Sequence, residues 1–186
     1  MDDKILFFSS FLQYPREIGS VVPSSKFLTD EIIRNIDFKS AKCIAEYGPG
    51  TGRMTVEILK RARKDSKIFC FEINKNFCNY LRKKFKDERL FIINDSAGNI
   101  KKYLKKFDIP KIDYVVSGLP FTNLTTNEKY VIIKEAKNTL KPNGKFLAFQ
   151  FVLNNFKKYL YKYFSNISMK FVPLNIPPCF VYVCEK

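Results

Sequence analysis

Three glycines alternate with other residues in the segment Glu46-Tyr47-Gly48-Pro49-Gly50-Thr51-Gly52, which lies between two segments of different hydrophobic pattern. Residues 41–48 form a short apolar run that predicts a buried strand, and residues 54–64 place apolar and basic side chains on opposite sides of a predicted helix. Glycine permits a tight turn and a close approach of the backbone to a ligand. The segment therefore predicts a ligand-binding loop, with a purely structural turn as the alternative.

The alternation of strand and helix continues along the chain. Continuous apolar runs are typical of a parallel sheet that helices cover on both faces. We therefore expect an α/β, Rossmann-like doubly wound domain that binds its ligand at the carboxyl ends of the strands, where the strand order reverses. The further expected strands are 67–73, 89–94, 112–117, 145–152, 168–173 and 180–185, and the further helices start after Asn74, near 97–106, after Asn127 and at 153–164.

The simplest domain organisation is a helical N-terminal extension, residues 1–30, that covers the site of a single domain formed by residues 31–186. Pro142-Asn143-Gly144 is expected to form a turn within that domain. No segment is apolar over a length that would span a bilayer, and no signal peptide is expected.

The composition excludes several kinds of catalytic site. The chain contains no histidine, which excludes Ser-His-Asp and Cys-His catalysis and any histidine-ligated metal. Its five cysteines form no C-x-x-C pair, so we expect reduced thiols in the cytoplasm and no bound metal. Cys43 and Cys70 lie in apolar runs and are expected to pack in the core.

The chain carries 33 Lys and Arg against 18 Asp and Glu, a formal net charge of +15. Such an excess favours an anionic partner, either nucleic acid or an acidic lipid surface. A lysine-rich proteome is the alternative explanation of the same charge.

Two acidic residues follow the second and third predicted strands. Glu72 ends the run 67–73, and a carboxylate there can accept hydrogen bonds from both hydroxyls of a ribose. Asp95 ends the run 89–94 and can accept a hydrogen bond from an adenine amino group. The dinucleotide fingerprint G-x-G-x-x-G/A is excluded, because Arg53 stands where it requires glycine or alanine. The glycine loop and the two acids converge on one crevice.

This arrangement, E-x-G-x-G-x-G followed by two strand-end acids, resembles the class I S-adenosylmethionine-dependent methyltransferases over about residues 41–152. The resemblance implies a seven-stranded sheet, mostly parallel, whose last strand is antiparallel. It also implies that S-adenosylmethionine is the cofactor, with the three glycines near its methionine part, Glu72 at the ribose and Asp95 at the adenine. The residues assigned to the cofactor are Ser25, Leu28, Glu46, Gly48, Gly50, Thr51, Gly52, Glu72, Ile73, Asp95, Ser96 and Ser117.

The methyl acceptor is less constrained, because two subfamilies are similar to this chain. Ser25-Lys26-Phe27-Leu28 together with the glycine loop resembles the ribosomal RNA adenine dimethyltransferases. Those enzymes carry an Asn-Leu-Pro-Tyr type of motif whose amide holds the adenine amino group. Here the segment reads Gly118-Leu119-Pro120-Phe121, and glycine has no side chain for that contact. The RNA enzymes also carry a helical domain after the core, whereas this chain ends at Lys186.

Three stretches resemble the bacterial phospholipid N-methyltransferases instead: residues 11–25, residues 116–120, and Asn175-Ile176-Pro177-Pro178. This resemblance implies methyl transfer to the headgroup nitrogen of phosphatidylethanolamine or its methylated forms. Methylation of RNA is the alternative, and a non-catalytic protein that binds S-adenosylmethionine or nucleic acid is a third hypothesis.

The residues expected at the reaction centre are Tyr14 and the segment Ser117, Gly118, Leu119, Pro120 and Phe121. Tyr14 and Phe121 can contact a methylated ammonium through their rings, with core packing as the alternative for each. No histidine is present to take the amine proton, so Tyr14, Glu17, the lipid phosphate and water remain open as acceptors.

Two aromatic segments bear on localisation. Residues 4–14 place large apolar side chains at helical spacing, which suits either an interfacial helix on a membrane or a helix that closes the cofactor cleft. Residues 156–164 mix lysines with aromatic side chains, which suits anionic headgroups, RNA or a solvated helix face. We expect a cytoplasmic protein bound peripherally to an anionic phospholipid membrane, with RNA as the other partner; the oligomeric state is not predicted.

Overall fold

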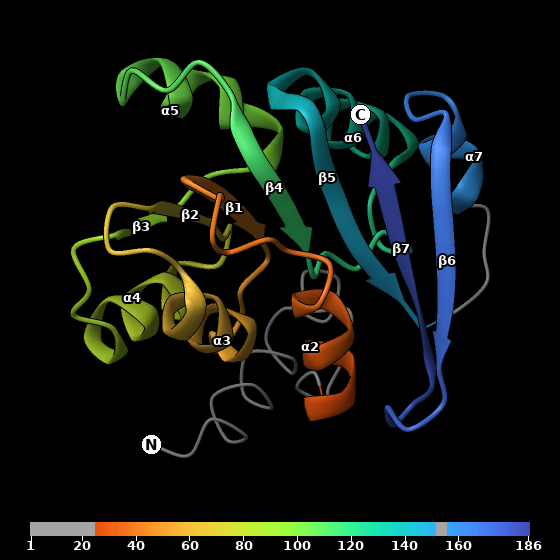
Figure 1. Ribbon diagram of the computed structural model, residues 1–186, viewed down its shortest axis with the longest axis horizontal. Coiled ribbons are helices and arrows are strands. Elements are labelled where there is room, and N and C mark those ends of the chain that lie inside the picture. The colour runs from red at the N-terminus through yellow and green to blue at the C-terminus, as the bar shows by residue number, and fades with distance from the viewer. Residues whose placement is uncertain (1–24, 152–155) are drawn as a thin grey trace.

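The chain folds into one twisted seven-stranded sheet with the strand order β3-β2-β1-β4-β5-β7-β6 (Figure 1). The computed structural model describes residues 25–151 and 156–186. The strands are β1 (Cys43–Tyr47), β2 (Lys67–Phe71), β3 (Leu90–Ile93), β4 (Ile112–Ser117), β5 (Leu140–Gln150), β6 (Asn166–Val172) and β7 (Cys179–Glu185). The helices are α2 (Lys26–Ile33), α3 (Arg53–Arg61), α4 (Lys75–Lys84), the 3-10 helix η1 (Ala97–Asn99), α5 (Ile100–Lys106), α6 (Thr126–Thr139) and α7 (Phe156–Tyr161).

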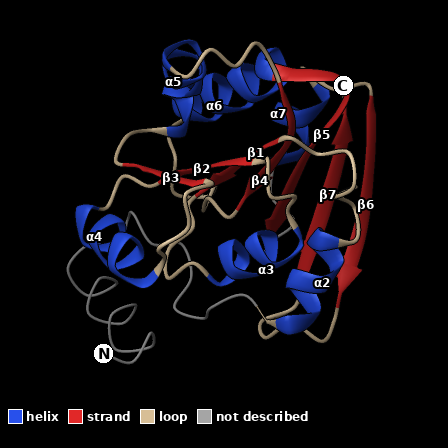
Figure 2. Ribbon diagram, turned by 60° about the vertical axis from the view of Figure 1, so that its left-hand side comes forward, coloured by secondary structure: helices blue, strands red, loops and turns tan. Residues whose placement is uncertain are grey.

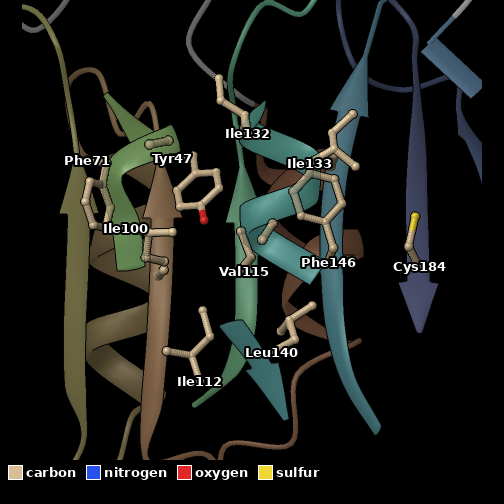
Figure 3. Close-up of a cluster of buried hydrophobic side chains, with 14 of the residues drawn as sticks. Tyr47, Phe71, Ile100, Ile112, Val115, Ile132, Ile133, Leu140, Phe146 and Cys184 are labelled. Carbon is tan, nitrogen blue, oxygen red and sulfur yellow. The ribbon is translucent and has the colours of Figure 1, made fainter. Parts of the chain in front are cut away.

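Helices cover both faces of the sheet, as the apolar strands require. Figure 2 shows α2, α3 and α4 on one side of the sheet and α5, α6 and α7 on the other. The larger apolar core lies between the sheet and the second group of helices, where Tyr47, Val115 and Phe146 pack together with Ile133 (Figure 3). The smaller core lies under α2 and α3 and includes Leu28. The expected core packing of Cys43 and Cys70 is confirmed, since both are buried free thiols.

The strand pairing confirms the predicted doubly wound topology. β1 pairs in parallel with β2 and with β4, and β2–β3 and β4–β5 are also parallel. β7 runs antiparallel to both of its neighbours, β5 and β6. The chain leaves β1 toward β2 on one side and later returns to β4 on the other, so the strand order reverses between β1 and β4. A ligand crevice is therefore expected outside the carboxyl ends of these two strands.

The helix starts depend on side-chain caps, and one predicted cap is wrong. Asn74 caps α4 as predicted, because its Oδ1 accepts hydrogen bonds from the backbone nitrogens of Asn76 (2.9 Å) and Phe77 (3.3 Å). Helix α6 is capped by Thr125 rather than by Asn127, because Thr125 and Glu128 form a reciprocal capping box.

Two further details differ from the sequence-based expectations. Pro142-Asn143-Gly144 is not a turn between elements but lies inside β5, where Asn143 has a φ of 64° and the β4–β5 register is irregular. The predicted helix 153–164 is observed as α7 and ends at Tyr161, earlier than predicted, while residues 153–155 lie outside the described residues. At Pro142-Asn143-Gly144 the local residues favour a turn, but the pairing of β5 with β4 and β7 carries the strand through this segment.

Helix α2 connects the N-terminal side of the domain to the last hairpin. Ser25 caps α2 by accepting the Leu28 N–H, and its own backbone nitrogen donates to Oδ1 of Asn175, 3.1 Å away, in the β6–β7 connection. The predicted boundary at residue 30 falls inside α2. The rest of the proposed extension, including the predicted helix 4–14 and Tyr14, lies outside the described residues and stays a prediction.

Candidate cofactor and acceptor site

The glycine loop has the backbone geometry that its sequence predicts. Gly48, Gly50 and Gly52 have φ angles of 70°, 54° and 78°, a region that residues with a Cβ rarely adopt. At Gly52 a Cβ would also lie 2.6 Å from the Phe85 ring and 2.7 Å from Leu81. The N-terminus of α3 follows directly, so the loop is confined between β1 and α4 and presents its backbone at the crevice.

Glu72 holds this loop against the end of β2. Its Oε2 accepts the Gly50 N–H (3.2 Å), and its Oε1 accepts the Asn74 N–H (2.9 Å). The carboxylate is buried and lies beside the crevice at the end of a strand adjacent to β1. A carboxylate can accept about four hydrogen bonds, so this role is compatible with binding ribose hydroxyls.

Glu46 is buried below the loop, where it connects three elements. Its Oε2 accepts hydrogen bonds from the Thr55 hydroxyl of α3 (2.7 Å) and from the Cys70 thiol of β2 (3.3 Å). Burial raises the pKa of Glu46 to about 7, against the opposing effect of these hydrogen bonds. The observed role of Glu46 is thus to join β1, α3 and β2, and its direct contact with the cofactor stays a prediction.

The predicted adenine residues lie at the end of β3. Asp95 Oδ1 accepts from the Ser96 N–H (2.7 Å) and the Asn99 amide (2.8 Å), and Oδ2 accepts from the Tyr103 hydroxyl (2.8 Å). Partial burial opposes ionisation, but these hydrogen bonds hold the pKa of Asp95 below its usual value. Asp95 is therefore an ionised and oriented acceptor. Ile73, directly after Glu72, leaves 52% of its surface exposed and offers an apolar face.

The segment after β4 lies directly against the glycine loop. The Gly118 N–H donates to the Tyr47 carbonyl (2.8 Å), and a Cβ at Gly118 would lie 3.1 Å from the Gly48 carbonyl oxygen. A Cβ at Gly48 would in turn meet the Leu119 side chain at 3.0 Å. The structure thus brings together the predicted cofactor loop and the predicted acceptor segment, which are far apart in sequence.

Two buried side chains hold the backbone of the acceptor segment through hydrogen bonds to Leu119. The buried Ser117 hydroxyl accepts the Leu119 N–H at 3.4 Å. The buried Gln150 at the end of β5 donates from Nε2 to the Leu119 carbonyl (3.1 Å). The sequence reasoning missed Gln150, because a lone glutamine at the end of an apolar run carries no spacing signal.

Four predicted site residues have roles in packing, helix capping or loop hydrogen bonding in this structure. Phe121 is 1% exposed and packs on Phe156 with the ring centroids 4.5 Å apart, which is the core-packing alternative and not the ammonium contact. Leu28 is fully buried in the smaller core, and Ser25 serves as the α2 cap. Pro120 follows Leu119 in the same loop, and its carbonyl accepts the Asn123 N–H at 2.9 Å.

The residues present fit S-adenosylmethionine. The glycine loop and the N-terminus of α3 would face the methionine part, Glu72 the ribose, and Ile73 with Asp95 and Ser96 the adenine. The side-chain nitrogen Nδ2 of Asn74 is buried and has no hydrogen-bond partner among the described residues. An acceptor atom of a ligand would satisfy this donor. Thr51 is buried in the loop itself. In the described part of the chain no cluster of acidic, cysteine or histidine side chains could hold a metal ion.

A doubly wound sheet with a glycine loop at its switch point and a buried carboxylate at the end of the adjacent strand is typical of Rossmann-like enzymes that bind a nucleotide cofactor. A family model described as "Methyltransferase domain" matches residues 44–144. The chain belongs to this family and is an S-adenosylmethionine-dependent methyltransferase.

Individual relatives differ in how much of the chain they resemble. The ornithine lipid N-methyltransferase of Singulisphaera acidiphila is 28% identical over 186 residues, which is 100% of this chain and 97% of that protein. The ribosomal RNA small subunit methyltransferase A of Mesomycoplasma hyopneumoniae is 32% identical over 106 residues, which is 57% of this chain and 38% of that protein. A SAM-dependent methyltransferase from Aquifex aeolicus has the same fold, with a TM-score of 0.65, 12% identity, and coverage of 100% of this chain and 98% of that chain.

Proposed function

We propose that this enzyme transfers the methyl group of S-adenosylmethionine to the amine of a membrane lipid headgroup. Phosphatidylethanolamine and its methylated forms, or an ornithine lipid, are the candidate acceptors. The observation that carries this proposal is the extent of the likeness to the ornithine lipid N-methyltransferase, which covers the whole chain and nearly the whole relative. The likeness to ribosomal RNA methyltransferase A covers 57% of the chain and does not extend to most of that enzyme.

The acceptor segment supports the lipid alternative over RNA. In the RNA enzymes that the sequence resembles, an asparagine amide at this place holds the adenine amino group. Here a Cβ at Gly118 would lie 3.1 Å from the Gly48 carbonyl oxygen, so a side chain at this position would require the two loops to move apart by a few tenths of an ångström. The segment therefore offers no side-chain amide at this position.

Positioning is the main task of the residues around the acceptor. When bound, S-adenosylmethionine supplies an electrophilic methyl group on a sulfonium. The Ser117–Phe121 segment, fixed by Gln150 and by its contact with Gly48, would orient the acceptor nitrogen toward that methyl. The glycine loop and the closely packed Leu119 would exclude water from the same place.

The acceptor must lose a proton before or during transfer, because only a neutral amine has the lone pair that attacks the methyl. A headgroup ammonium has a pKa of about 10, similar to that of lysine. Desolvation in the crevice lowers this value and favours the neutral amine. The proton would pass to Tyr14, to Glu17, to the lipid phosphate or to water. Tyr14 and Glu17 lie outside the described residues.

The N-terminal extension, residues 1–30, is proposed to cover this crevice, and the enzyme is proposed to work at the cytoplasmic surface of a membrane. No helix in the described ranges is long and apolar enough to cross a bilayer.

A direct test offers methyl-labelled S-adenosylmethionine with one acceptor at a time. The purified enzyme is incubated with vesicles that contain phosphatidylethanolamine, with vesicles that contain an ornithine lipid, and with ribosomal RNA. We expect label in one of the lipids and none in RNA. Label in RNA alone would contradict the proposal and favour the RNA alternative.

A further inference from the structure

The connection between β6 and β7 is an apolar tip at the edge of the molecule. Its sequence is Pro173-Leu174-Asn175-Ile176-Pro177-Pro178, which contains no charged residue. Leu174 is 61% exposed and Ile176 is 77% exposed, whereas Asn175 between them is buried. Exposed large apolar side chains that gather in one place mark interaction sites more often than single ones do.

The tip is held in one conformation by the side chain of Asn175. Its Oδ1 accepts the Ser25 N–H (3.1 Å), and its Nδ2 donates to the Pro177 carbonyl (2.6 Å). The first hydrogen bond also brings the start of α2 beside the tip, where Phe27 is 52% exposed. Leu174, Ile176 and Phe27 are therefore exposed on two segments that this hydrogen bond joins. An ion pair of 2.8 Å between Lys170 of β6 and Glu31 of α2 also connects the two elements.

The tip lies on the same edge of the sheet as the cofactor crevice. This follows from the topology: β7 is the antiparallel strand, so the connection that precedes it is at the carboxyl ends of the parallel strands. Ser117 at the crevice is level with Ala148 of β5 and Tyr182 of β7, and the hairpin continues for three more residues to Cys179. At about 3.3 Å per residue the tip begins about 10 Å beyond the crevice. Figure 1 shows the hairpin and α2 extending together past the end of β4.

Three exposed basic residues also lie along this edge, beside the carboxylates of the proposed cofactor site. The first residues of α2, α3 and α4 are Lys26, Arg53 and Lys75, and none of these helices has an acidic residue in its first turn. All three side chains are exposed, and none is in an ion pair with a carboxylate of the described residues. Basic residues at a helix N-terminus add to the positive end of the helix dipole, which is unfavourable for the isolated domain. The arrangement favours an anionic surface opposite this edge.

We propose that the β6–β7 tip, together with Phe27, inserts into the interface of an anionic lipid bilayer, while Lys26, Arg53 and Lys75 contact its headgroups. This inference rests on the proposed lipid function and specifies how the site meets its substrate. A bilayer fits the combination better than a protein partner does, since the apolar groups project at one tip and the cations spread behind it over three helices. In this orientation the crevice opens toward the membrane, and a headgroup amine reaches the acceptor segment without leaving the bilayer.

The test compares vesicle binding of full-length variants. The tip variant is Leu174→Ser/Ile176→Ser. Met169→Ser, an exposed apolar residue on β6 outside the tip, is the matched control, and Tyr161→Ser on the basic aromatic helix α7 tests the competing surface. Each protein is sedimented with vesicles of phosphatidylcholine alone and with vesicles that also contain phosphatidylglycerol. Cofactor affinity and circular dichroism verify that each variant is folded.

We expect the tip variant to lose at least about tenfold in affinity for the anionic vesicles, because two large apolar side chains no longer insert, while both single variants stay within about twofold. Lys26→Gln/Lys75→Gln should reduce the preference for anionic over neutral vesicles. Unchanged binding of the tip variant, a larger loss for Tyr161→Ser, or no binding of the wild type to either vesicle would overturn the proposal. Because binding is measured without turnover, tip-dependent binding without lipid methylation would reject the proposed function and leave the docking surface in place.

Discussion

The buried carboxyl of Glu46 makes the stability of this domain depend on pH in a range where few other groups titrate. Its pKa is about 7 in the folded protein, because burial disfavours the charged form, and near 4.5 in an unfolded chain. Between these values the folded state binds a proton that the unfolded state has released. The contribution of Glu46 to the free energy of unfolding is therefore fully present below about pH 4.5. It decreases as the pH rises and is lost above about pH 7.

The expected size follows from the same two values. A difference of about 2.5 pH units at 1.36 kcal/mol per unit corresponds to about 3 kcal/mol. The chain has no histidine, so no side chain with an ordinary pKa titrates between pH 5 and 7 and obscures the effect. Asp95, whose pKa is below its usual value, changes stability only at more acidic pH.

Urea denaturation from pH 5 to 7.5 measures this dependence. We expect the unfolding free energy of the wild type to decrease by about 2.4 kcal/mol over this range, because part of the full difference is already lost below pH 5 and a little remains above pH 7.5. That of Glu46→Gln should be nearly constant, because the amide oxygen can still accept from Thr55 but carries no titrating proton. Glu57→Gln on the surface of α3 is the control and should keep the wild-type slope, since ion pairs with Lys60 and Arg61 hold the pKa of Glu57 below its usual value. A flat wild-type profile, or a Glu46→Gln profile as steep as that of the wild type, would refute the reasoning.

Four further predictions concern the cofactor, the loop and the membrane. Glu72→Ala should weaken S-adenosylmethionine binding by about 1.5–3 kcal/mol in calorimetry, with Glu72→Gln intermediate, and unchanged affinity in a folded variant would remove Glu72 from the site. Gly52→Ala should cost about 1–3 kcal/mol in urea denaturation, because its φ of 78° and the nearby Phe85 ring oppose a Cβ. Sedimentation should show stronger binding to anionic than to neutral vesicles and a decrease with salt, and equal binding at all salt concentrations would contradict it. Removal of residues 1–13 should lower turnover on vesicles more than cofactor affinity, and parallel losses would favour a cleft-closing role instead.

The sheet and its cofactor loop could be predicted because their signals are local. Each parallel strand is a continuous apolar run, and the glycine loop needs positive φ angles that only glycine adopts freely. The positions of Glu72 and Asp95 follow from the same logic, since a residue that directly follows a parallel strand must lie at the carboxyl edge. These features require no knowledge of which segments pack together.

The details that sequence reasoning missed depend on long-range contacts. Gln150 holds the Leu119 carbonyl from a different strand, and nothing in the residues around position 150 indicates this partner. The sequence left Phe121 open between the substrate and the core, and its ring packs in the core against Phe156 of α7, a contact that nothing near position 121 indicates. The prediction that Asn127 caps α6 is wrong for a local reason. Thr125, two residues before Asn127, forms a capping box with Glu128 and so starts the helix earlier.

The proposed cofactor residues and the β6–β7 connection lie at different ends of the sheet. The residues proposed to bind the cofactor follow β1, β2 and β3, whereas the proposed acceptor segment follows β4 and the proposed docking tip connects β6 to β7. A Cβ at Gly118 would lie 3.1 Å from the Gly48 carbonyl oxygen, so the acceptor segment and the cofactor loop pack closely on each other. This contact favours a constant distance between the proposed donor and acceptor sites. The hairpin pairs only with β5 and contacts α2, so its connection can change without disturbing the cofactor site. Under the proposed function, the methyl donor is held at the β1–β3 end of the sheet while the acceptor class can vary at the hairpin end, where the uncharged connection 173–178 suits a lipid surface better than the phosphates of RNA.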